Sequence, residues 1–311
     1  MPGRILVCDE IHADGIELLR RRGFEVDVRL DLGGEGLRAE LPKYSAVIVR
    51  GRTKLTKDLL PASGGLKLIV RAGVGLDNID LDAANALGIK VMATPEATTQ
   101  SVAELTLGLI LSLLRRISFN DAALKSGKWV KSGSMGRELR GSVLGVVGAG
   151  GRIGSEVARM AKVGFGADVV GFDIVDIGQK ASAIGFRVAG SLDELLRDSD
   201  IATIHVPYLP STHHLIDRRR IGLMKEGALL VNTSRAEIVD GRAALEALKA
   251  GRLGGLALDV FSKEPPVDAW ERELVESERC VCTCHIGAQT LEGQRRASLA
   301  AAERISEFFG A

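Results

Sequence analysis

The sequence lacks an excess of charge of either sign. Its 311 residues include 41 Lys and Arg against 40 Asp and Glu, a formal net charge of +1. No net field would therefore gather nucleic acid or an anionic membrane around the protein. We expect neither of them as a partner.

Long apolar runs are also missing. The most apolar segment, residues 105–114, is about half the length of a membrane span and is flanked by Glu104 and Arg115. Near the start, residues 5–8 are too short a run for a secretory signal and are followed by Asp9 and Glu10. We expect a cytoplasmic protein.

Cysteine is scarce, with four residues, of which Cys280, Cys282 and Cys284 alternate in RCVCTCH. Alternation in a strand would put them on one face, about 6.5 to 7 Å apart. Thiolates that share a zinc ion each lie about 2.3 Å from it, so an extended C-x-C-x-C cannot chelate one. We therefore expect buried, reduced thiols and no metal.

Short apolar runs alternate with helical stretches along the whole chain. This pattern predicts parallel sheets with helices on both faces, an α/β fold. Strands are expected in the first part of the chain at residues 4–8, 24–28, 46–49, 66–70 and 89–92, and in the second at 143–147, 168–172, 201–206, 228–232, 256–259 and 280–283. The ligand of such a doubly wound sheet lies beyond the carboxyl ends of its strands.

The stretch from residue 142 to 173 reads as strand, glycine turn, helix, strand and acid. A glycine turn lets the backbone approach a pyrophosphate, and the N-terminus of the following helix favours that anion. An acid about 20 residues on accepts hydrogen bonds from the adenosine ribose and repels a 2′-phosphate, which favours NAD over NADP. The residues proposed for this task are Gly148, Gly150, Gly151, Arg152, Ile153 and Asp173.

The turn itself, GAGGRIG, is one residue longer than G-x-G-x-x-G. Either Gly148 and Gly150 begin the fingerprint in a longer loop, or Gly150, Gly151 and Gly154 perform its task with Ala149 first. The sequence leaves both possibilities open.

A long helix is expected over residues 101–124, with Ser101 as N-cap and Glu104 completing a capping box. The last helix, residues 290–309, follows the final strand and is expected to pack back on the first domain. We therefore predict a discontinuous domain of residues 1–98 and 287–311, and a second domain of residues 99–286, with hinges near residues 98 and 287.

Three polar residues follow strand ends in the second domain: Arg235, Glu264 and His285. Histidine, with an ordinary pKa of about 6.5, suits proton transfer, and a carboxylate beside it fixes its tautomer. A guanidinium can hold a carboxylate with two parallel hydrogen bonds. Singly, each of the three would also suit a solvated loop.

Seven segments in register resemble the D-isomer-specific 2-hydroxyacid dehydrogenase family over almost the whole chain. The segments are RAGVGLDNID (71–80), SVAE (101–104), GRELRGSVLGVVG (136–148), HVP (205–207), MKEGALLVNTSRAEIVD (224–240), ALDVFSKEPP (257–266) and HIGAQT (285–290). The resemblance implies a Rossmann-type NAD-binding domain (99–286) and a discontinuous flavodoxin-like substrate domain (1–98 and 287–311).

The resemblance also implies roles for individual residues. By this resemblance, His285 is the catalytic acid/base, Glu264 is its partner, and Arg235 binds and activates the substrate. The substrate also contacts Val74, Gly75 and His285. The resemblance implies further cofactor contacts, among which Asp259 meets the nicotinamide carboxamide. The others are His205, Val206, Pro207, Thr212, Thr233, His285 and Gly287. Dimerisation through the long-helix region is another trait of the family.

Within the family, residues 50–56, 71–80 and 128–141 are most similar to D-3-phosphoglycerate dehydrogenases. Arg50, Arg52 or Lys54 would then meet the phosphate, or each is a solvated loop charge. Because the chain ends at Ala311, we expect no C-terminal regulatory domain and no feedback control by serine. The expected reaction is NAD-dependent oxidation of 3-phospho-D-glycerate to 3-phosphohydroxypyruvate, a step of serine biosynthesis.

Two other functions remain open. A glyoxylate, hydroxypyruvate or D-lactate reductase would use the same scaffold without a phosphate-binding cation. A non-catalytic NAD(H)-sensing protein would bind the cofactor without turnover.

Overall fold

A computed structural model describes residues 3–60 and 64–311. The chain divides into two compact units, one of Met1–Ser101 with Ala288–Ala311 and one of Val102–Gly287. These units begin and end within about three residues of the expected hinges near residues 98 and 287. Each unit contains one wholly parallel sheet with helices on both faces, as the α/β prediction requires.

The smaller unit holds a five-stranded sheet of order β2-β1-β3-β4-β5, which is the flavodoxin-like order. Its central strands are buried on both sides, and β3 has no exposed residue, so they read as continuous apolar runs instead of alternating ones. The strands are β1 (Arg4–Val7), β2 (Glu25–Val28), β3 (Ala46–Val49), β4 (Leu68–Arg71) and β5 (Lys90–Ala93).

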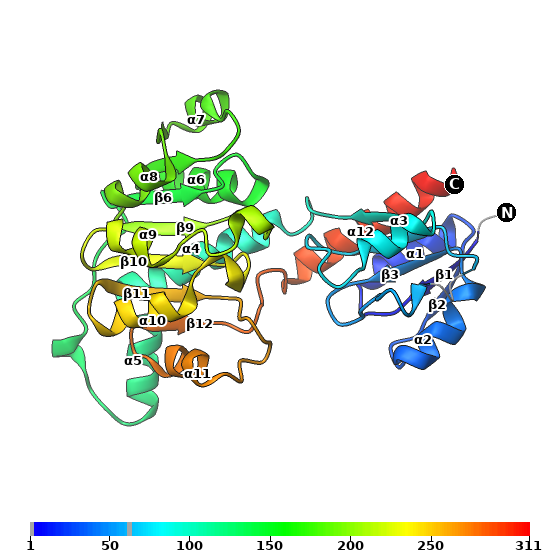
Figure 1. The fold of residues 1–311 in the computed structure, drawn as a ribbon, viewed down its shortest axis with the longest axis horizontal. Coiled ribbons are helices and arrows are strands. Elements are labelled where there is room, and N and C mark those ends of the chain that lie inside the picture. Colours follow the sequence, from blue (N-terminus) through cyan, green and yellow to red (C-terminus); the bar gives the residue numbers. More distant parts are fainter. Residues whose placement is uncertain (1–2, 61–63) are drawn as a thin grey trace. The chain divides into compact units, whose positions relative to one another are not determined.

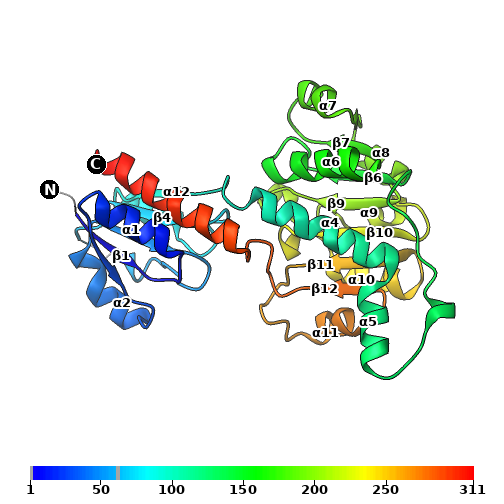
Figure 2. The same cartoon turned by 180° about the vertical axis from the view of Figure 1, so that it is seen from behind.

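Helices cover both faces of this sheet. Helices α1 (Ala13–Arg21) and α12 (Leu291–Phe309) pack side by side on one face (Figure 2), where Gly15 leaves no room for a Cβ against Ser298. Helices α2 (Gly34–Glu40) and α3 (Leu81–Ala86) cover the other face, with the short helix η1 (Leu41–Lys43). The chain's last helix therefore belongs to the first domain, as predicted.

The larger unit holds a seven-stranded sheet of order β12-β11-β10-β9-β6-β7-β8. Counted from β6, this is the doubly wound order 3-2-1-4-5-6 of a Rossmann fold with one further strand. The strands are β6 (Val143–Val147), β7 (Asp168–Phe172), β8 (Arg187–Val188), β9 (Ile201–Ile204), β10 (Ala228–Asn232), β11 (Leu253–Leu258) and β12 (Cys280–Cys282).

Helices on the two faces of this sheet form two separate cores. Figure 1 shows the face of α8 (Leu192–Asp198), α9 (Arg218–Leu223) and α10 (Gly241–Lys249), and α11 (Ala269–Glu276) packs into the same core. Figure 2 shows the face of α4 (Thr99–Arg115) and α6 (Arg152–Phe165), whose core also includes residues of α7 (Gly178–Ile184). Short 3-10 helices are η3 (Lys131–Gly133), η4 (Pro210–Thr212) and η5 (Ala236–Ile238).

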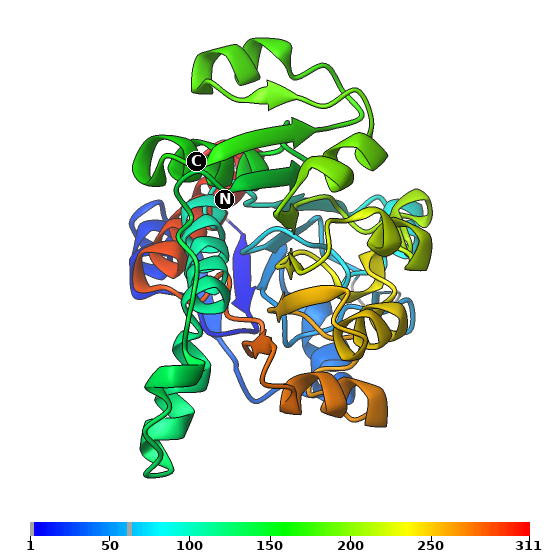
Figure 3. The ribbon, with the colours of Figure 1, turned by 90° about the vertical axis from the view of Figure 1, so that its left-hand side faces the viewer.

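The prediction of one helix over residues 101–124 is wrong. Helix α4 begins at Thr99 and ends at Arg115, and α5 (Ile117–Lys125) starts after Arg116, whose backbone is left-handed with φ 52°. Ser101 is therefore inside the helix and its hydroxyl lies 2.8 Å from that of Thr290. Because of the break, α5 leaves the direction of α4 (Figure 2) and extends beyond the sheet (Figure 3).

The cysteine prediction is partly wrong. Cys8 is buried, but Cys280 and Cys282 are only partly buried and Cys284 is exposed. The sulfur atoms of Cys280 and Cys282 lie 3.4 Å apart, not 6.5 to 7 Å, because the two side chains turn toward each other along the strand. Among residues 3–60 and 64–311, no group of three or more His, Cys, Asp and Glu side chains is arranged to hold a metal ion.

Within the described residues, every helix is too short or too polar to cross a bilayer.

Candidate active site

The sheet of the larger unit brings the predicted site residues to one edge. Arg235 follows β10, Glu264 follows β11 and His285 follows β12, and these three strands are neighbours in the sheet. Because the strands are parallel, all three loops leave the same edge. The glycine turn after β6, Asp173 after β7 and residues 205–207 after β9 share that edge.

His285 and Glu264 are in direct contact. Nδ1 of His285 lies 2.9 Å from both carboxylate oxygens of Glu264, and both side chains are nearly half exposed, at 46% and 42%. A neutral imidazole that donates from Nδ1 to a carboxylate carries its lone pair on Nε2. This arrangement leaves Nε2 as the ring atom that can accept a proton.

Asp259 anchors the loop that carries His285. The residue is 1% exposed. Its Oδ1 accepts hydrogen bonds from the Thr283 hydroxyl at 2.6 Å and the Ile286 amide at 2.8 Å, and its Oδ2 accepts one from the Gly287 amide at 2.9 Å. His285 itself has a left-handed backbone, with φ 53°, between these anchored residues. One buried carboxylate therefore holds the Thr283 side chain before the histidine and two backbone amides after it.

Arg235 is held by the polar end of β10. The side chain of the buried Asn232 makes two hydrogen bonds. Its Nδ2 donates to the Arg235 backbone carbonyl at 2.8 Å, and its Oδ1 accepts from the Ser234 backbone amide at 3.0 Å. Nη1 of Arg235 donates to the Ser234 carbonyl at 2.7 Å. The VNTSR segment thus forms a compact turn that fixes the base of the arginine side chain.

The backbone of the turn after β6 requires glycine at two positions, Gly148 and Gly154. Gly148 makes the tight turn, with φ 85°, and a Cβ there would lie 2.5 Å from the His205 carbonyl oxygen. A Cβ at Gly154 would lie 2.2 Å from the Gly148 carbonyl oxygen, so α6 packs closely on the turn. Gly151 is the N-cap, and no side chain caps the helix. Arg152 and Ile153 form its first turn, whose amides suit an anion.

Asp173 lies at the end of β7 beside this turn. Its Oδ2 accepts from the Gly150 amide at 2.8 Å and its Oδ1 from the Ile174 amide at 2.7 Å. The carboxylate therefore stands next to the glycine turn, as the dinucleotide interpretation requires.

The remaining predicted cofactor contacts line the same edge. The Ser234 hydroxyl donates to the Val206 carbonyl at 2.5 Å, and the Thr212 hydroxyl donates to the Pro207 carbonyl at 2.7 Å. The His205 ring lies 2.9 Å from the Thr203 hydroxyl. The Thr233 hydroxyl lies 3.0 Å from that of Thr106. These bonds order the loops after β9 and β10.

Three predicted substrate contacts, Arg50, Val74 and Gly75, belong to the smaller unit. Arg50 follows β3, while Val74 and Gly75 follow β4, so all three lie at the carboxyl edge of their own sheet. The Arg50 amide donates to Asp9 Oδ2 at 2.6 Å, and its Nη1 donates to the Glu10 carbonyl at 3.1 Å.

Asp9 organises the loop after Arg50 and was not singled out in the sequence. Arg52 donates to Asp9 and to the Cys8 and Leu30 carbonyls. Burial opposes the charge of Asp9, but hydrogen bonds from Thr53, Arg50 and Arg52 outweigh it and hold the pKa of this carboxyl below its usual value. Arg52 therefore acts as a brace of this loop through its three hydrogen bonds.

Glu271 is a second residue that sequence reasoning missed. It is 1% exposed, and its Oε1 accepts from the amide and the hydroxyl of Ser262 at 2.8 and 2.7 Å. Ser262 lies two residues before Glu264, so Glu271 holds the loop that carries the histidine's partner. A buried acid on α11 gives no sign in the sequence of this tertiary contact.

Comparison with known proteins identifies the family. Residues 107–287 match the model of the D-isomer specific 2-hydroxyacid dehydrogenase NAD binding domain. The chain is 39% identical over 308 residues to a hydroxypyruvate reductase of Thermotoga maritima, covering 99% of this chain and 98% of that protein.

A D-3-phosphoglycerate dehydrogenase of Methanocaldococcus jannaschii is 41% identical over 304 residues, which are 98% of this chain. The chain spans only 57% of that relative's length.

Among solved structures, a D-lactate dehydrogenase of Aquifex aeolicus in complex with NAD and lactic acid superposes with a TM-score of 0.84. It is 31% identical, and the match covers 99% of this chain and 95% of that one. The expected family, the two parallel α/β sheets and the NAD-binding domain are therefore confirmed. The chain belongs to the D-isomer specific 2-hydroxyacid dehydrogenase family.

Proposed function

We propose that this protein is an NAD-dependent dehydrogenase of D-2-hydroxy acids. The observation that carries the proposal is the contact between His285 Nδ1 and the Glu264 carboxylate, at 2.9 Å, at the carboxyl edge of a Rossmann sheet. A histidine oriented in this way is a general base for a substrate hydroxyl. In this proposal the larger unit holds the cofactor and the smaller unit, with Val74 and Gly75, contributes to substrate binding.

The residues at the edge of the larger sheet fit a dinucleotide. Gly148, Gly150 and Gly151 have no Cβ to hinder the approach of a pyrophosphate to the backbone of the turn, and the N-terminus of α6 has no side-chain cap. In this proposal Asp173 accepts hydrogen bonds from the ribose hydroxyls, and its charge disfavours the 2′-phosphate of NADP. NAD, when bound, accepts the hydride from the substrate.

The protein's own groups manage the proton and the carboxylate. Nε2 of His285 takes the proton of the substrate's C2 hydroxyl, and Glu264 stabilises the resulting imidazolium through Nδ1. The Arg235 guanidinium binds the substrate carboxylate and polarises the developing carbonyl. Asp259 keeps His285 in place throughout, because it holds the residues on both sides.

We propose 3-phospho-D-glycerate as the substrate, with Arg50 as the cation that meets its phosphate. The names of relatives such as the Methanocaldococcus jannaschii protein support this choice. A guanidinium carries five N–H donors, so Arg50 retains donors for a phosphate beyond the one that binds Glu10.

Reduction of hydroxypyruvate is the second candidate. It is favoured by the Thermotoga maritima hydroxypyruvate reductase, which this chain matches along almost the whole length of both proteins. The two candidates differ in the phosphoryl group. Steady-state rates with 3-phosphoglycerate, glycerate, D-lactate and hydroxypyruvate separate them.

The Arg50→Gln variant refines this test. It should raise KM for the phosphorylated substrate alone if Arg50 binds the phosphate. An equal change in KM for hydroxypyruvate would contradict that role.

We further propose that the protein forms a homodimer through α5 and the segment after it. This part of the larger unit extends beyond the sheet (Figure 3) and exposes large apolar side chains: Leu124 is 58%, Trp129 81% and Met135 90% exposed. Apolar side chains grouped in this way commonly mark an interface. Light scattering of the purified protein should give twice the chain mass, and the variant Trp129→Ser with Met135→Ser should shift it toward the monomer.

A further inference from the structure

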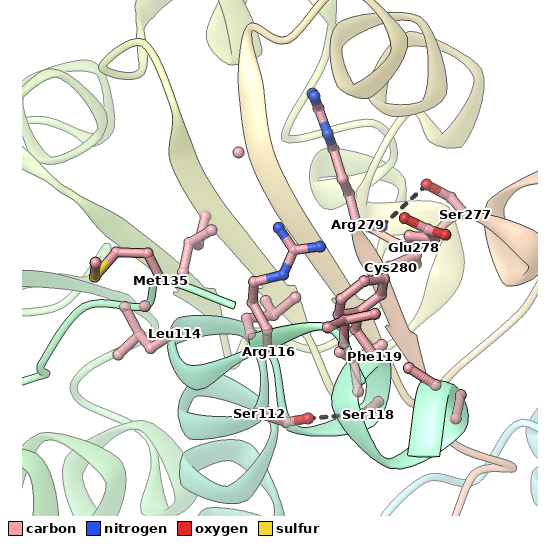
Figure 4. Close-up of a pocket in the computed structure, with 18 of the residues that line it drawn as sticks. Ser112, Leu114, Arg116, Ser118, Phe119, Met135, Ser277, Glu278, Arg279 and Cys280 are labelled. Carbon is pink, nitrogen blue, oxygen red and sulfur yellow. Dashed lines mark hydrogen bonds between the residues drawn. The ribbon is translucent and has the colours of Figure 1, made fainter. Parts of the chain in front are cut away.

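Two thiols face each other on the edge strand of the larger sheet, and the dehydrogenase chemistry does not use them. The sulfur atoms of Cys280 and Cys282 lie 3.4 Å apart on β12, and both residues are partly exposed. Cys280 lines a cavity of about 710 Å³ between α5 and the loop before β12 (Figure 4). We propose that this pair is a dithiol site that binds a thiophilic trivalent atom, with arsenic(III) as the probe.

The strand geometry disfavours a disulfide between the two residues. Cys280 pairs with Leu256 and Cys282 with Leu258 in the parallel ladder, so β12 is extended between them. Residues i and i+2 of an extended strand are about 6.5 to 7 Å apart, at the upper limit of the Cα separation that a disulfide spans. Closing the bond would pull β12 out of its register with β11.

A four-coordinate metal ion also fits poorly. Two thiolates of a tetrahedral zinc site, each at about 2.3 Å from the ion, lie about 3.8 Å apart. Such an ion needs further ligands, and in the described part of the chain no third His, Cys, Asp or Glu completes a group. A pyramidal trivalent atom has bonds near right angles and needs only two thiolates from the protein, which agrees with sulfur atoms 3.4 Å apart.

The electrostatics of the pair favour the reaction. The hydrogen bond from Cys280 lowers the pKa of Cys282, so Cys282 forms the first thiolate. With a monosubstituted arsenic(III) oxide, two As–S bonds form and the As–O bonds break. The oxygen leaves as water with the two thiol protons, and neither arsenic nor sulfur changes oxidation state. No oxidant or reductant is required.

The other two cysteines provide controls. Burial raises the pKa of the Cys8 thiol to about 12, so this residue should not react in the folded protein. Cys284 is exposed and lies beyond the end of β12, which is formed by Cys280–Cys282. A single thiol holds arsenic(III) far more weakly than two, by about 10² to 10⁴-fold from the effective concentration of the second.

The test is native mass spectrometry of the full chain with equimolar phenylarsine oxide. The wild type and Cys284→Ser should each retain one arsenical, which a dithiol removes and a monothiol does not. Cys280→Ser and Cys282→Ser should lose it, with the affinity lowered by about 10² to 10⁴-fold. Circular dichroism confirms that each variant is folded, and Cys280→Ala and Cys282→Ala replace any serine variant that is not.

Retention of the adduct by folded Cys282→Ser, or its loss in Cys284→Ser, would overturn the proposal. So would the absence of any adduct on the wild type. These readouts do not depend on catalysis, so they stand whatever the substrate proves to be.

Discussion

His285 and Glu264 are joined through Nδ1, which lies 2.9 Å from each of the two carboxylate oxygens. They are 21 residues apart in the chain and follow two adjacent strands of one sheet. The carboxylate has no acidic proton to give, so its contribution is to hold the ring and to stabilise its protonated form. The predictions below follow from this pair and from the residues that support it.

Replacing Glu264 by Gln should lower kcat by at least about tenfold, equivalent to about 1.4 kcal/mol, because the amide keeps the shape but loses the charge. The binding of NAD should change little. Glu276→Gln, an exposed acid on α11, is the matched control and should leave kcat unchanged. Stopped-flow and steady-state kinetics measure both variants, and equal rates for Glu264→Gln and the wild type would exclude the pairing from the mechanism.

Asp259→Ala should destabilise the larger unit by about 2 to 3 kcal/mol, because it removes the acceptor of three hydrogen bonds at a buried position. Thr283→Val removes one of the three and should cost about 1 kcal/mol. Both tryptophans, Trp129 and Trp270, lie in the larger unit, so denaturant titration followed by tryptophan fluorescence reports on it. A loss for Asp259→Ala no greater than that for Thr283→Val would contradict the anchoring role.

Asp173→Asn should reduce the preference for NAD over NADP. Removing the charge beside the glycine turn lowers the repulsion of a 2′-phosphate, and we expect the ratio of kcat/KM values to fall by about tenfold, or about 1.4 kcal/mol. Asp176→Asn, an exposed carboxylate three residues away, is the control. If both variants keep the wild-type ratio, Asp173 does not select the cofactor.

The ion pairs of Asp193 should make part of the protein's folding stability depend on pH in the acidic range. Hydrogen bonds from Arg219 and Arg220 lower the pKa of this carboxyl from 3.8 to about 2. A pKa that is lower in the folded state stabilises the protein above pH 3.8, and this contribution is lost as the pH falls toward 2. The unfolding free energies of the wild type and Asp193→Asn should therefore differ by a constant amount above about pH 5 and converge only below about pH 2. A difference that does not depend on pH would contradict this assignment.

The fold could be read from the sequence because each local pattern agreed with the next. Buried parallel strands such as β3 and β10 have no polar residue before their last position, and amphipathic helices separate them. The break between α4 and α5 could not be read. Arg116 adopts a left-handed backbone without a glycine or proline nearby to signal it, and apolar residues continue on both sides.

For the candidate site, the sequence alone predicts only that certain polar residues follow the ends of strands. The sequence shows Arg235, Glu264 and His285 after successive strands, and their proposed roles come from the resemblance to a family. The support from Asp259 and Glu271 depends on tertiary contacts that no spacing reveals. The pairing of Cys280 with Cys282 depends on side-chain rotamers, which strand geometry alone does not specify.

The most direct test of the proposed function is the turnover of His285→Ala with the best substrate of the panel, beside its affinity for NAD measured by calorimetry. The account predicts that kcat falls by about 10² to 10⁴-fold while the dissociation constant of NAD stays within about twofold of the wild type. A kcat within about threefold of the wild type would contradict the assignment of His285 as the base.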